Sequence, residues 1–411
     1  MKILFLTHYF YPEVNAPAAR TLEHCRAWVD AGHDVTVVTN VPNHPKGKIY
    51  PGYKNALYQS EVKDGIKVYR MLTWLAPNAG FMKRVANFLT YMFMATFAAP
   101  FLPKADIVVS TSPQFFAGLA GYFVSRIKRA KWVLEIRDLW PESAIAVGAI
   151  SNERLVKATE GLESFMYRKA DAVVSVTDSF VSHIADRDVP EERIHVIKNG
   201  VDLEFYDPDV PRDASAVDPR LEGKYVAAYV GTHGMAHALH TILEAAELLK
   251  GREDIIFLMV GDGAEKEKLT KMRQDMQLSN VVMLDQQPKD AMPAIWAVTD
   301  VSLVLLKNED LFKTVLPSKI VESMAMKRPI VLGVRGEAQA MVEEAKAGIC
   351  IEPENAQELA DAITKLADER DLAADYGASG REFVEAKFDR RKLAARMEQI
   401  LLDVVNGGTG K

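Results

Sequence analysis

Side chains able to bind a phosphorylated ligand gather in the segment LPSKIVES, from Leu316 to Ser323. Pro317 stands where a helix prefers its first residue, and Ser318, Lys319 and Glu322 fall away from the apolar face of that helix. Free backbone N–H groups, an ammonium and a hydroxyl suit a diphosphate, and a nearby carboxylate can accept both hydroxyls of a ribose. The same spacing is also that of an ordinary solvated Lys/Glu pair.

Two glycine-containing loops earlier in the second half offer further contacts. YVGTHGMAHAL places Gly231 and His233 after one expected strand, and VGDGAEKEKL places Gly261 and Asp262 after the next; Leu284 lies at the end of the strand that follows. Such loops lead into helix N-termini, where phosphate is favoured, so these residues join the expected donor-binding set. Neither loop is GxGxxG or a P-loop, and a glycine turn after a strand is also an ordinary connection.

In the first half, Asp138 ends an expected strand within RDLWPES. A carboxylate there can orient an acceptor hydroxyl, or it can cap the helix that follows. Arg20, near the start of the first expected helix, and Asn15, just before it, are candidates for contact with a donor phosphate. We expect Asp138, Lys319 and Glu322 to be the catalytic residues.

The elements that must position these residues alternate along the chain. Short apolar, β-rich runs are followed by longer amphipathic stretches, which is the pattern of a parallel sheet covered by crossover helices, and the fold class is α/β. The expected strands are 3–9, 34–40, 66–70, 106–112, 131–138, 172–177, 194–200, 225–231, 255–261, 281–285, 301–306, 329–334 and 348–353.

The alternation restarts in the second half, which predicts two similar domains in tandem. Between them lies a stretch rich in Asp and Pro without helical or strand periodicity, and we place the linker at residues 206–222. The first domain is expected at 1–205 and the second at 223–384. A helix at 385–411 is expected to pack back toward the first domain. The cleft between two such domains is the default ligand site.

Composition excludes several classes of function. The chain has 411 residues, 48% of them apolar and 26% charged, and its formal net charge is −6. That charge argues against a nucleic-acid partner, since the basic field such binding needs is missing. The two cysteines, Cys25 and Cys350, lie far apart in no metal-like spacing, which fits a reducing cytoplasm and predicts neither a disulfide framework nor a zinc site.

The run VANFLTYMFMATFAAPFL, from Val85 to Leu102, complicates the picture of a soluble protein. Its length lies at the low edge for a membrane-spanning helix, and polar residues and a proline interrupt it. Three readings stay open at this stage: a buried helix, a helix lying in a membrane interface, and a span.

The motifs also resemble a known family. PSKIVESMA and the following KRPIVLGV are similar to the donor-site helix of the family 4 retaining glycosyltransferases, with Glu322 matching the second of the family's paired glutamates. YFYPEVNAPAARTLEHCRAWVDAGHDVTVVT looks like the family's opening, and KNGVDLEFYDP (198–208) like its signature at the end of the first domain, so the resemblance covers almost the whole chain. EIRDLWPES (135–143) and GTHGMAHAL are similar to the subgroup that builds bacterial surface polysaccharides, including N-acetyl-L-fucosamine transferases.

Two departures from the family pattern concern the donor. The first glutamate of the pair falls at Thr314, so the usual carboxylate contact with the donor sugar is missing. Many members also hold the diphosphate with an Arg and a Lys from the loop after the first strand of the second domain, where this chain has His233 and His237. Lys319 is our candidate for the missing positive charge.

The resemblance implies two Rossmann-like domains that face a central cleft, the GT-B fold, with the acceptor bound by the first domain and the nucleotide sugar by the second. It implies metal-independent, hexosyltransferase-type transfer with retention from a UDP-sugar to a lipid-linked acceptor, a polyprenyl-diphosphate sugar. No cofactor or metal is expected. The protein would then be cytoplasmic, at or near the inner face of the cytoplasmic membrane.

Two other functions are compatible with the same architecture. A UDP-N-acetylglucosamine 2-epimerase has two such domains but acts on its nucleotide sugar without a second substrate. A noncatalytic nucleotide-sugar-binding protein would keep the fold without turnover.

Overall fold

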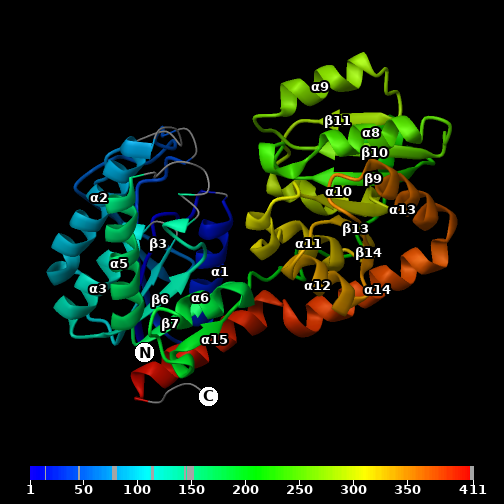
Figure 1. The fold of residues 1–411 in the computed structure, drawn as a ribbon. Coiled ribbons are helices and arrows are strands. Elements are labelled where there is room, and N and C mark those ends of the chain that lie inside the picture. The colour runs from blue at the N-terminus through cyan, green and yellow to red at the C-terminus, as the bar shows by residue number, and fades with distance from the viewer. Residues whose placement is uncertain are drawn as a thin grey trace. The chain divides into compact units, whose positions relative to one another are not determined.

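The structure is a computed structural model that describes residues 1–13, 15–44, 47–75, 81–112, 115–142, 145 and 152–407 (Figure 1). Contacts divide the chain into two compact units. Unit 1 comprises Met1–Asn199 and Arg390–Lys411, and unit 2 comprises Gly200–Asp389. Ser143, at the end of the EIRDLWPES motif, lies outside the described residues.

Unit 1 is built on an eight-stranded sheet in the order β3-β4-β2-β1-β5-β6-β7-β8. All neighbouring strands are parallel except the pair β3 and β4. Its central strands are buried on both faces, which explains their continuous apolar sequences. The strands are β1 (Lys2–Leu6), β2 (Asp34–Asn40), β3 (Tyr58–Lys63), β4 (Ile66–Met71), β5 (Ile107–Thr111), β6 (Lys131–Ile136), β7 (Ala172–Ser175) and β8 (Ile194–Val196).

Helices cover both faces of this sheet. The described ones are α1 (Ala16–Asp30), α2 (Phe81–Ala98), α3 (Phe115–Lys128), α5 (Glu153–Lys169), α6 (Val181–Ala185) and α15 (Arg390–Val405). Asn15 caps α1, since its side chain accepts a hydrogen bond from the backbone N of Ala18 at 2.9 Å. Trp28 of α1 stacks on Phe5 and donates its indole N–H to the backbone oxygen of Ala394, 3.1 Å away, which fastens α15 to α1.

Strand β3 is the one described strand that the sequence did not predict. Its side chains are exposed or half-buried throughout, because it lies at the edge of the sheet, so the run YQSEVK carries no apolar pattern. The overlooked signal is Asp64-Gly65, the dipeptide between β3 and β4. Both residues have positive φ (51° and 75°), as a two-residue hairpin turn requires.

The apolar run from Val85 to Leu102 forms most of α2 and the 3₁₀ turn η1 (Ala99–Phe101). Tyr91 and Ala95 are fully buried on the unit 1 core, so one face of α2 is an ordinary packing surface. Among the described helices, none combines the length and the apolar character that crossing a membrane requires.

Unit 2 contains a second, wholly parallel sheet in the order β11-β10-β9-β12-β13-β14. The strands are β9 (Tyr225–Val230), β10 (Ile255–Val260), β11 (Val281–Leu284), β12 (Val301–Leu305), β13 (Ile330–Gly333) and β14 (Gly348–Cys350). The helices are α7 (Ala214–Val217), α8 (His240–Leu248), α9 (Lys266–Asp275), α10 (Met292–Val298), α11 (Ser318–Ala325), α12 (Glu337–Ala345), α13 (Ala356–Asp368) and α14 (Arg370–Lys387). Two parallel α/β sheets confirm the expected fold class.

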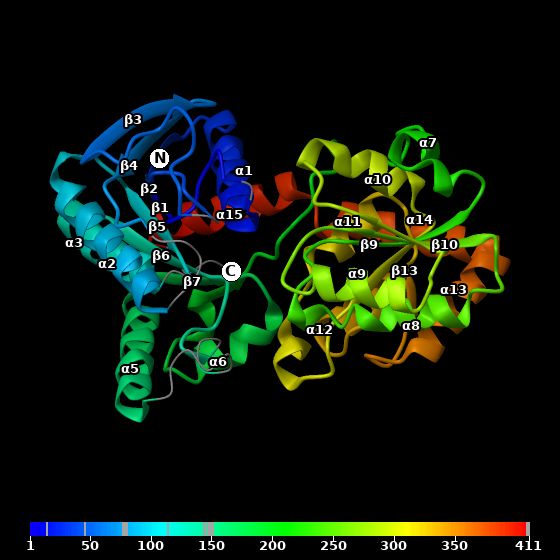
Figure 2. The ribbon, with the colours of Figure 1, turned by 90° about the horizontal axis from the view of Figure 1, so that it is seen from above.

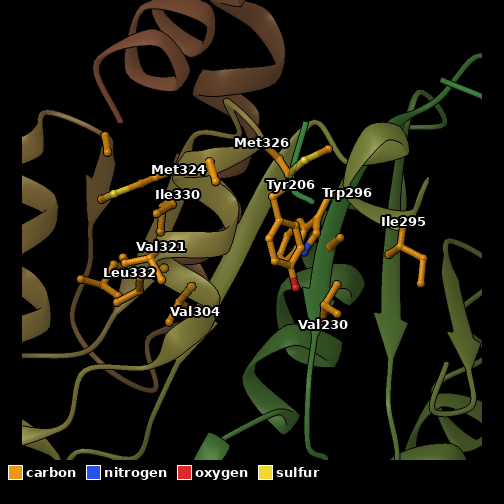
Figure 3. Close-up of a cluster of buried hydrophobic side chains, with 14 of the residues drawn as sticks. Tyr206, Val230, Ile295, Trp296, Val304, Val321, Met324, Met326, Ile330 and Leu332 are labelled. Atoms are coloured by element: carbon orange, nitrogen blue, oxygen red, sulfur yellow. The ribbon is translucent and has the colours of Figure 1, made fainter. Parts of the chain in front are cut away.

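The segment 206–222, expected as a linker, lies within unit 2. It forms α7 and the 3₁₀ turn η4 (Pro219–Leu221). Its buried residues join the apolar cluster on one face of the sheet, part of which Figure 3 shows with Tyr206 beside Trp296. Burying such aromatic side chains stabilises a domain by roughly 2–3 kcal/mol each.

Candidate functional site

The carboxyl ends of three neighbouring strands of unit 2 lie at one level. The register pairs Val230 of β9 with Val260 of β10, and Val260 with Leu284 of β11. The loops after β9 and β10 therefore leave the sheet side by side, at the edge where parallel sheets bind ligands.

Backbone hydrogen bonds join these two loops. The backbone N of Gly231 donates to the oxygen of Val260 at 2.9 Å, and that of His233 to the oxygen of Asp262 at 2.9 Å. Gly261 is required at the contact, because a Cβ there would lie 1.9 Å from the Gly231 oxygen. The structure thus brings Gly231, His233, Gly261 and Asp262 together at one edge of the sheet.

Lys266 holds the loop after β10 in place. Its Nζ donates to the backbone oxygens of Gly261 and Leu284, at 2.9 and 2.8 Å. Its ammonium is therefore used in joining the loop after β10 to the end of β11. This role was not predicted, because nothing in the spacing of VGDGAEKEKL indicates which carbonyls the lysine reaches.

Lys319 lies at the start of α11 with its side chain buried, only 8% of the residue being exposed. Its Nζ sits 3.6 Å from the centroid of the Tyr229 ring and has no hydrogen-bond partner. Burial lowers the pKa of this ammonium to about 7, although Glu322 raises it. The expected alternative of a solvated Lys/Glu pair is wrong, since this lysine is withdrawn from solvent.

Gly231 makes room for the Lys319 ammonium. A Cβ at position 231 would lie 2.9 Å from Nζ, and the positive φ of 145° at Gly231 is one that glycine adopts readily. The close approach of a backbone and a lysine head group explains why a glycine follows β9. The contact joins the first loop to α11 within unit 2.

Two histidines complete the surroundings of Lys319. Both lie beside Tyr229, with ring centroids 5.9 Å away for His233 and 6.0 Å for His237. Burial, followed by the charges of Lys266 and Lys319 for His233 and of Lys319 for His237, lowers the pKa of each to about 4, so both imidazoles are neutral at pH 7. His233 is fully buried and neither of its ring nitrogens has a partner.

The remaining predicted residues of unit 2 lie at the N-terminal end of α11. Pro317 is the residue before the helix rather than its first residue, and Ser318 is the first helical residue and exposed. Glu322 and Thr314 are half-buried. Ser323 donates to Ser302 of β12 at 2.7 Å, which ties α11 to the sheet.

In unit 1, Asp138 follows β6 and is half-buried, and Arg137 precedes it. Nη1 of Arg137 is buried without a hydrogen-bond partner, and burial lowers the pKa of this guanidinium to about 10 although Glu135 raises it. Burial also raises the pKa of the Glu135 carboxyl, but Arg20 and Arg137 outweigh it and hold that pKa at about 2.

Arg20 is used within unit 1. Its Nε donates to Glu135 at 2.9 Å, and its Nη atoms donate to the backbone oxygens of Lys198 (2.8 Å) and Ile197 (2.9 Å). The side chain therefore links α1 to β6 and to the end of β8, and we assign it a positioning role. Asn15 uses Oδ1 as the helix cap, whereas its Nδ2 is buried without a partner.

One group among the described residues has the composition of a metal site. The ligand atoms of Glu142, Glu163 and His183 lie within 4.8 Å of one another. Arg187 donates to Glu163 at 2.6 Å and to Glu142 at 2.8 Å, so a guanidinium already neutralises these carboxylates. We interpret the group as an ion-pair network that holds α5 and α6 together.

Comparisons with known proteins agree with this architecture. Residues 15–200 match the family described as "Glycosyl transferase 4-like domain", and residues 212–383 match "Glycosyl transferases group 1". The "Putative colanic acid biosynthesis glycosyl transferase WcaI" of Escherichia coli (strain K12) is 24% identical, over 98% of this chain and 100% of that protein. The "GDP-mannose-dependent alpha-mannosyltransferase" of Mycolicibacterium smegmatis is 23% identical, over 94% and 93%.

Solved structures show the same fold. The sucrose-phosphate synthase of Thermosynechococcus elongatus superposes with a TM-score of 0.76 at 17% identity, covering 99% of this chain and 100% of that one. Alr3699/HepE of Anabaena, solved in complex with UDP, gives a TM-score of 0.70 at 17% identity, covering 98% and 100%.

Proposed function

Since the chain belongs to the family 4 glycosyltransferases of the GT-B fold, we propose that it transfers a sugar from a UDP-sugar to a lipid-linked sugar acceptor in bacterial surface-polysaccharide synthesis. The proposal that the chain binds a nucleotide-sugar donor rests on one observation: the ammonium of Lys319 is buried and has no hydrogen-bond partner. It lies at the strand ends where nucleotide ligands bind in such sheets.

The electrostatics of this place call for an anion. A buried ammonium without a hydrogen-bond partner is costly, and its lowered pKa is the sign of that cost, although the charge of Glu322 offsets part of it. The N-terminus of α11 adds about half a positive charge and free backbone N–H groups. A diphosphate would satisfy both, and the neutral imidazole of His233 can donate one N–H more.

The same charges would stabilise the leaving nucleoside diphosphate. Negative charge develops on its phosphate as the bond to the sugar breaks, and a preorganised ammonium in a buried place stabilises it without a metal. Glu322, one turn into α11, would accept the hydroxyls of the ribose. In unit 1, Asp138 would orient the acceptor hydroxyl, and transfer would proceed with retention, the donor's own phosphate oxygen taking the proton.

The choice of UDP and of the acceptor class draws on the relatives. HepE binds UDP in its solved complex, and the relative of Escherichia coli carries colanic acid biosynthesis in its name. The mycolicibacterial relative uses GDP-mannose, so a guanine nucleotide is the competing donor.

The test is a transfer assay with a panel of UDP-sugars and GDP-sugars, with and without a polyprenyl-diphosphate sugar. Transfer with UDP-sugars that persists in EDTA supports the proposal. Formation of an epimer without acceptor would identify a 2-epimerase, and binding without turnover would identify a nucleotide-sugar-binding protein. Lys319→Ala is expected to weaken UDP binding at least tenfold, whereas Lys365→Ala, an exposed lysine of α13, should bind as the wild type.

A further inference from the structure

The outer surfaces of α2, η1 and α3 expose large apolar side chains. Phe97 is 71% exposed and Phe101 90%, and three more residues of this surface are exposed to a lesser extent. We call the set the aromatic face: Phe93, Phe97, Phe101, Phe123 and Ile127.

The aromatic face is one surface of neighbouring elements. Helices α2 and α3 lie side by side on one side of the unit 1 sheet (Figures 1 and 2). The Nζ of Lys128, near the end of α3, donates to the backbone oxygen of Leu102, just after η1. Phe93, Phe97 and Phe101 are spaced by four residues, so they project from one side of α2 and its continuation, while Tyr91 and Ala95 are buried on the other.

Basic residues predominate in the segment that carries the aromatic face. Residues 81–131 contain seven Lys or Arg and a single acidic residue, Asp106, a formal net charge of +6. Because the whole chain carries −6, the remaining residues carry −12. The segment that carries the aromatic face therefore has a positive net charge in a chain that is acidic overall.

A basic cavity adjoins the end of α3. It has a volume of about 450 Å³, and its lining includes three cations, Arg126, Arg129 and Lys131, and two carboxylates, Asp106 and Asp171. Lys131 is paired with Asp171 at 2.9 Å, and Arg126 stacks on the ring of Tyr122. The ionisable residues that line the cavity thus carry a formal net charge of +1 near the C-terminal end of α3.

We propose that the aromatic face docks on an anionic lipid bilayer. Aromatic side chains inserted at the headgroup level and Lys or Arg side chains against lipid phosphates are the two contacts an interfacial segment makes. The biological reason for this docking rests on the proposed function, because a lipid-linked acceptor is located in a bilayer. The docking itself does not depend on it. A second copy of the chain is a poor occupant, because self-association would bring two surfaces of the same high positive charge together.

The experiment is flotation of the full chain with vesicles of phosphatidylcholine containing about 30% phosphatidylglycerol, and with vesicles of phosphatidylcholine alone. We expect binding to the anionic vesicles that weakens with added salt. The double variant Phe97→Glu/Phe101→Glu should lose about tenfold or more in binding. Leu155→Glu, at an exposed leucine of α5 in the same unit, is the matched control and should bind as the wild type.

Two outcomes of the flotation experiment overturn the proposal: no flotation of the wild type, or equal binding by the wild type and the double variant. A wild-type dimer in light scattering that the double variant abolishes would show that the face is an interface between copies. Circular dichroism confirms that each variant is folded. Transfer to a short-chain, detergent-soluble acceptor should be unchanged in the double variant. Vesicle binding without any transfer would refute the proposed function and leave the docking surface standing, whereas transfer without vesicle binding would do the reverse.

Discussion

The titration of Lys319 gives a sharp test of the donor site. Burial brings the pKa of this ammonium from its ordinary 10.5 to about 7 in the ligand-free protein. The protonated fraction is then about nine tenths at pH 6, about one tenth at pH 8 and about one hundredth at pH 9. A bound diphosphate requires the protonated form, so UDP affinity should fall as pH rises through 7, by up to about tenfold per pH unit.

Titration calorimetry with UDP from pH 6 to pH 9 measures this slope. The wild type should weaken steadily above pH 7, whereas Lys319→Met, of similar length and without charge, should bind weakly at every pH. His233 and His237, whose pKa values are about 4, stay neutral throughout this range and add no slope of their own. Lys365→Met is the control for loss of a lysine elsewhere in unit 2.

The free energy of unfolding of the ligand-free protein provides a second test of the lowered Lys319 pKa. The folded pKa is the lower one, so the unfolded chain holds more protons between pH 7 and 10.5, and the free energy of unfolding rises across that window. The shift corresponds to as much as about 5 kcal/mol, a penalty that is complete below pH 7 and gone above 10.5. Without UDP, Lys319→Met should therefore melt higher than the wild type at pH 6, and the difference should shrink toward pH 10. UDP affinity that is flat from pH 6 to 9, or a methionine variant that binds UDP as tightly as the wild type at pH 6, would refute the reasoning.

Three further predictions concern the neighbouring residues. Arg20→Met should lower the free energy of unfolding of unit 1 by about 3–5 kcal/mol in urea denaturation, because it leaves Glu135 buried without its ion pair. Gly261→Ala should weaken UDP binding and lower the melting temperature, since its Cβ would collide with the Gly231 oxygen; unchanged UDP affinity would show that the two loops tolerate separation. Asp138→Asn should reduce kcat by about a hundredfold with little change in the donor KM, and a change confined to the donor KM would count against its role toward the acceptor.

The fold was largely predictable, because the strands of a parallel sheet that is buried on both faces have continuous apolar sequences. Each expected strand overlaps a strand of the structure. Strand β3 was not predicted. It is an edge strand without an apolar pattern, and only the Asp64-Gly65 turn after it indicates a hairpin in the sequence. The segment 206–222 was predicted to be a linker, because its Asp and Pro residues are typical of an irregular chain. In the structure it forms α7 and η4, and its buried Tyr206 joins the core of unit 2.

The sequence predicts that the loops after β9 and β10 lie close together, but it does not predict the contacts made by the side chains of the candidate site. Helical periodicity places Lys319 among the polar residues of α11, and only a distant segment decides that it is buried. The ring of Tyr229 and the missing side chain of Gly231 form the space that its head group fills. The contacts of Arg20 could not be predicted either, because its hydrogen-bond acceptors at Glu135 and Ile197 are far away in sequence.

The departure from the family's diphosphate ligands is explained by the same geometry. A cation at position 233 would stand in the same buried space as Lys319, and two neighbouring cations there would each lower the other's pKa. Neutral histidines at 233 and 237 remove that conflict, and Lys266 is already committed to the carbonyls of Gly261 and Leu284. In the proposed donor site, the positive charge for the diphosphate would then come from α11 rather than from the loop after β9. Restoring a loop lysine by His233→Lys should therefore lower UDP affinity in the wild type and raise it in Lys319→Met.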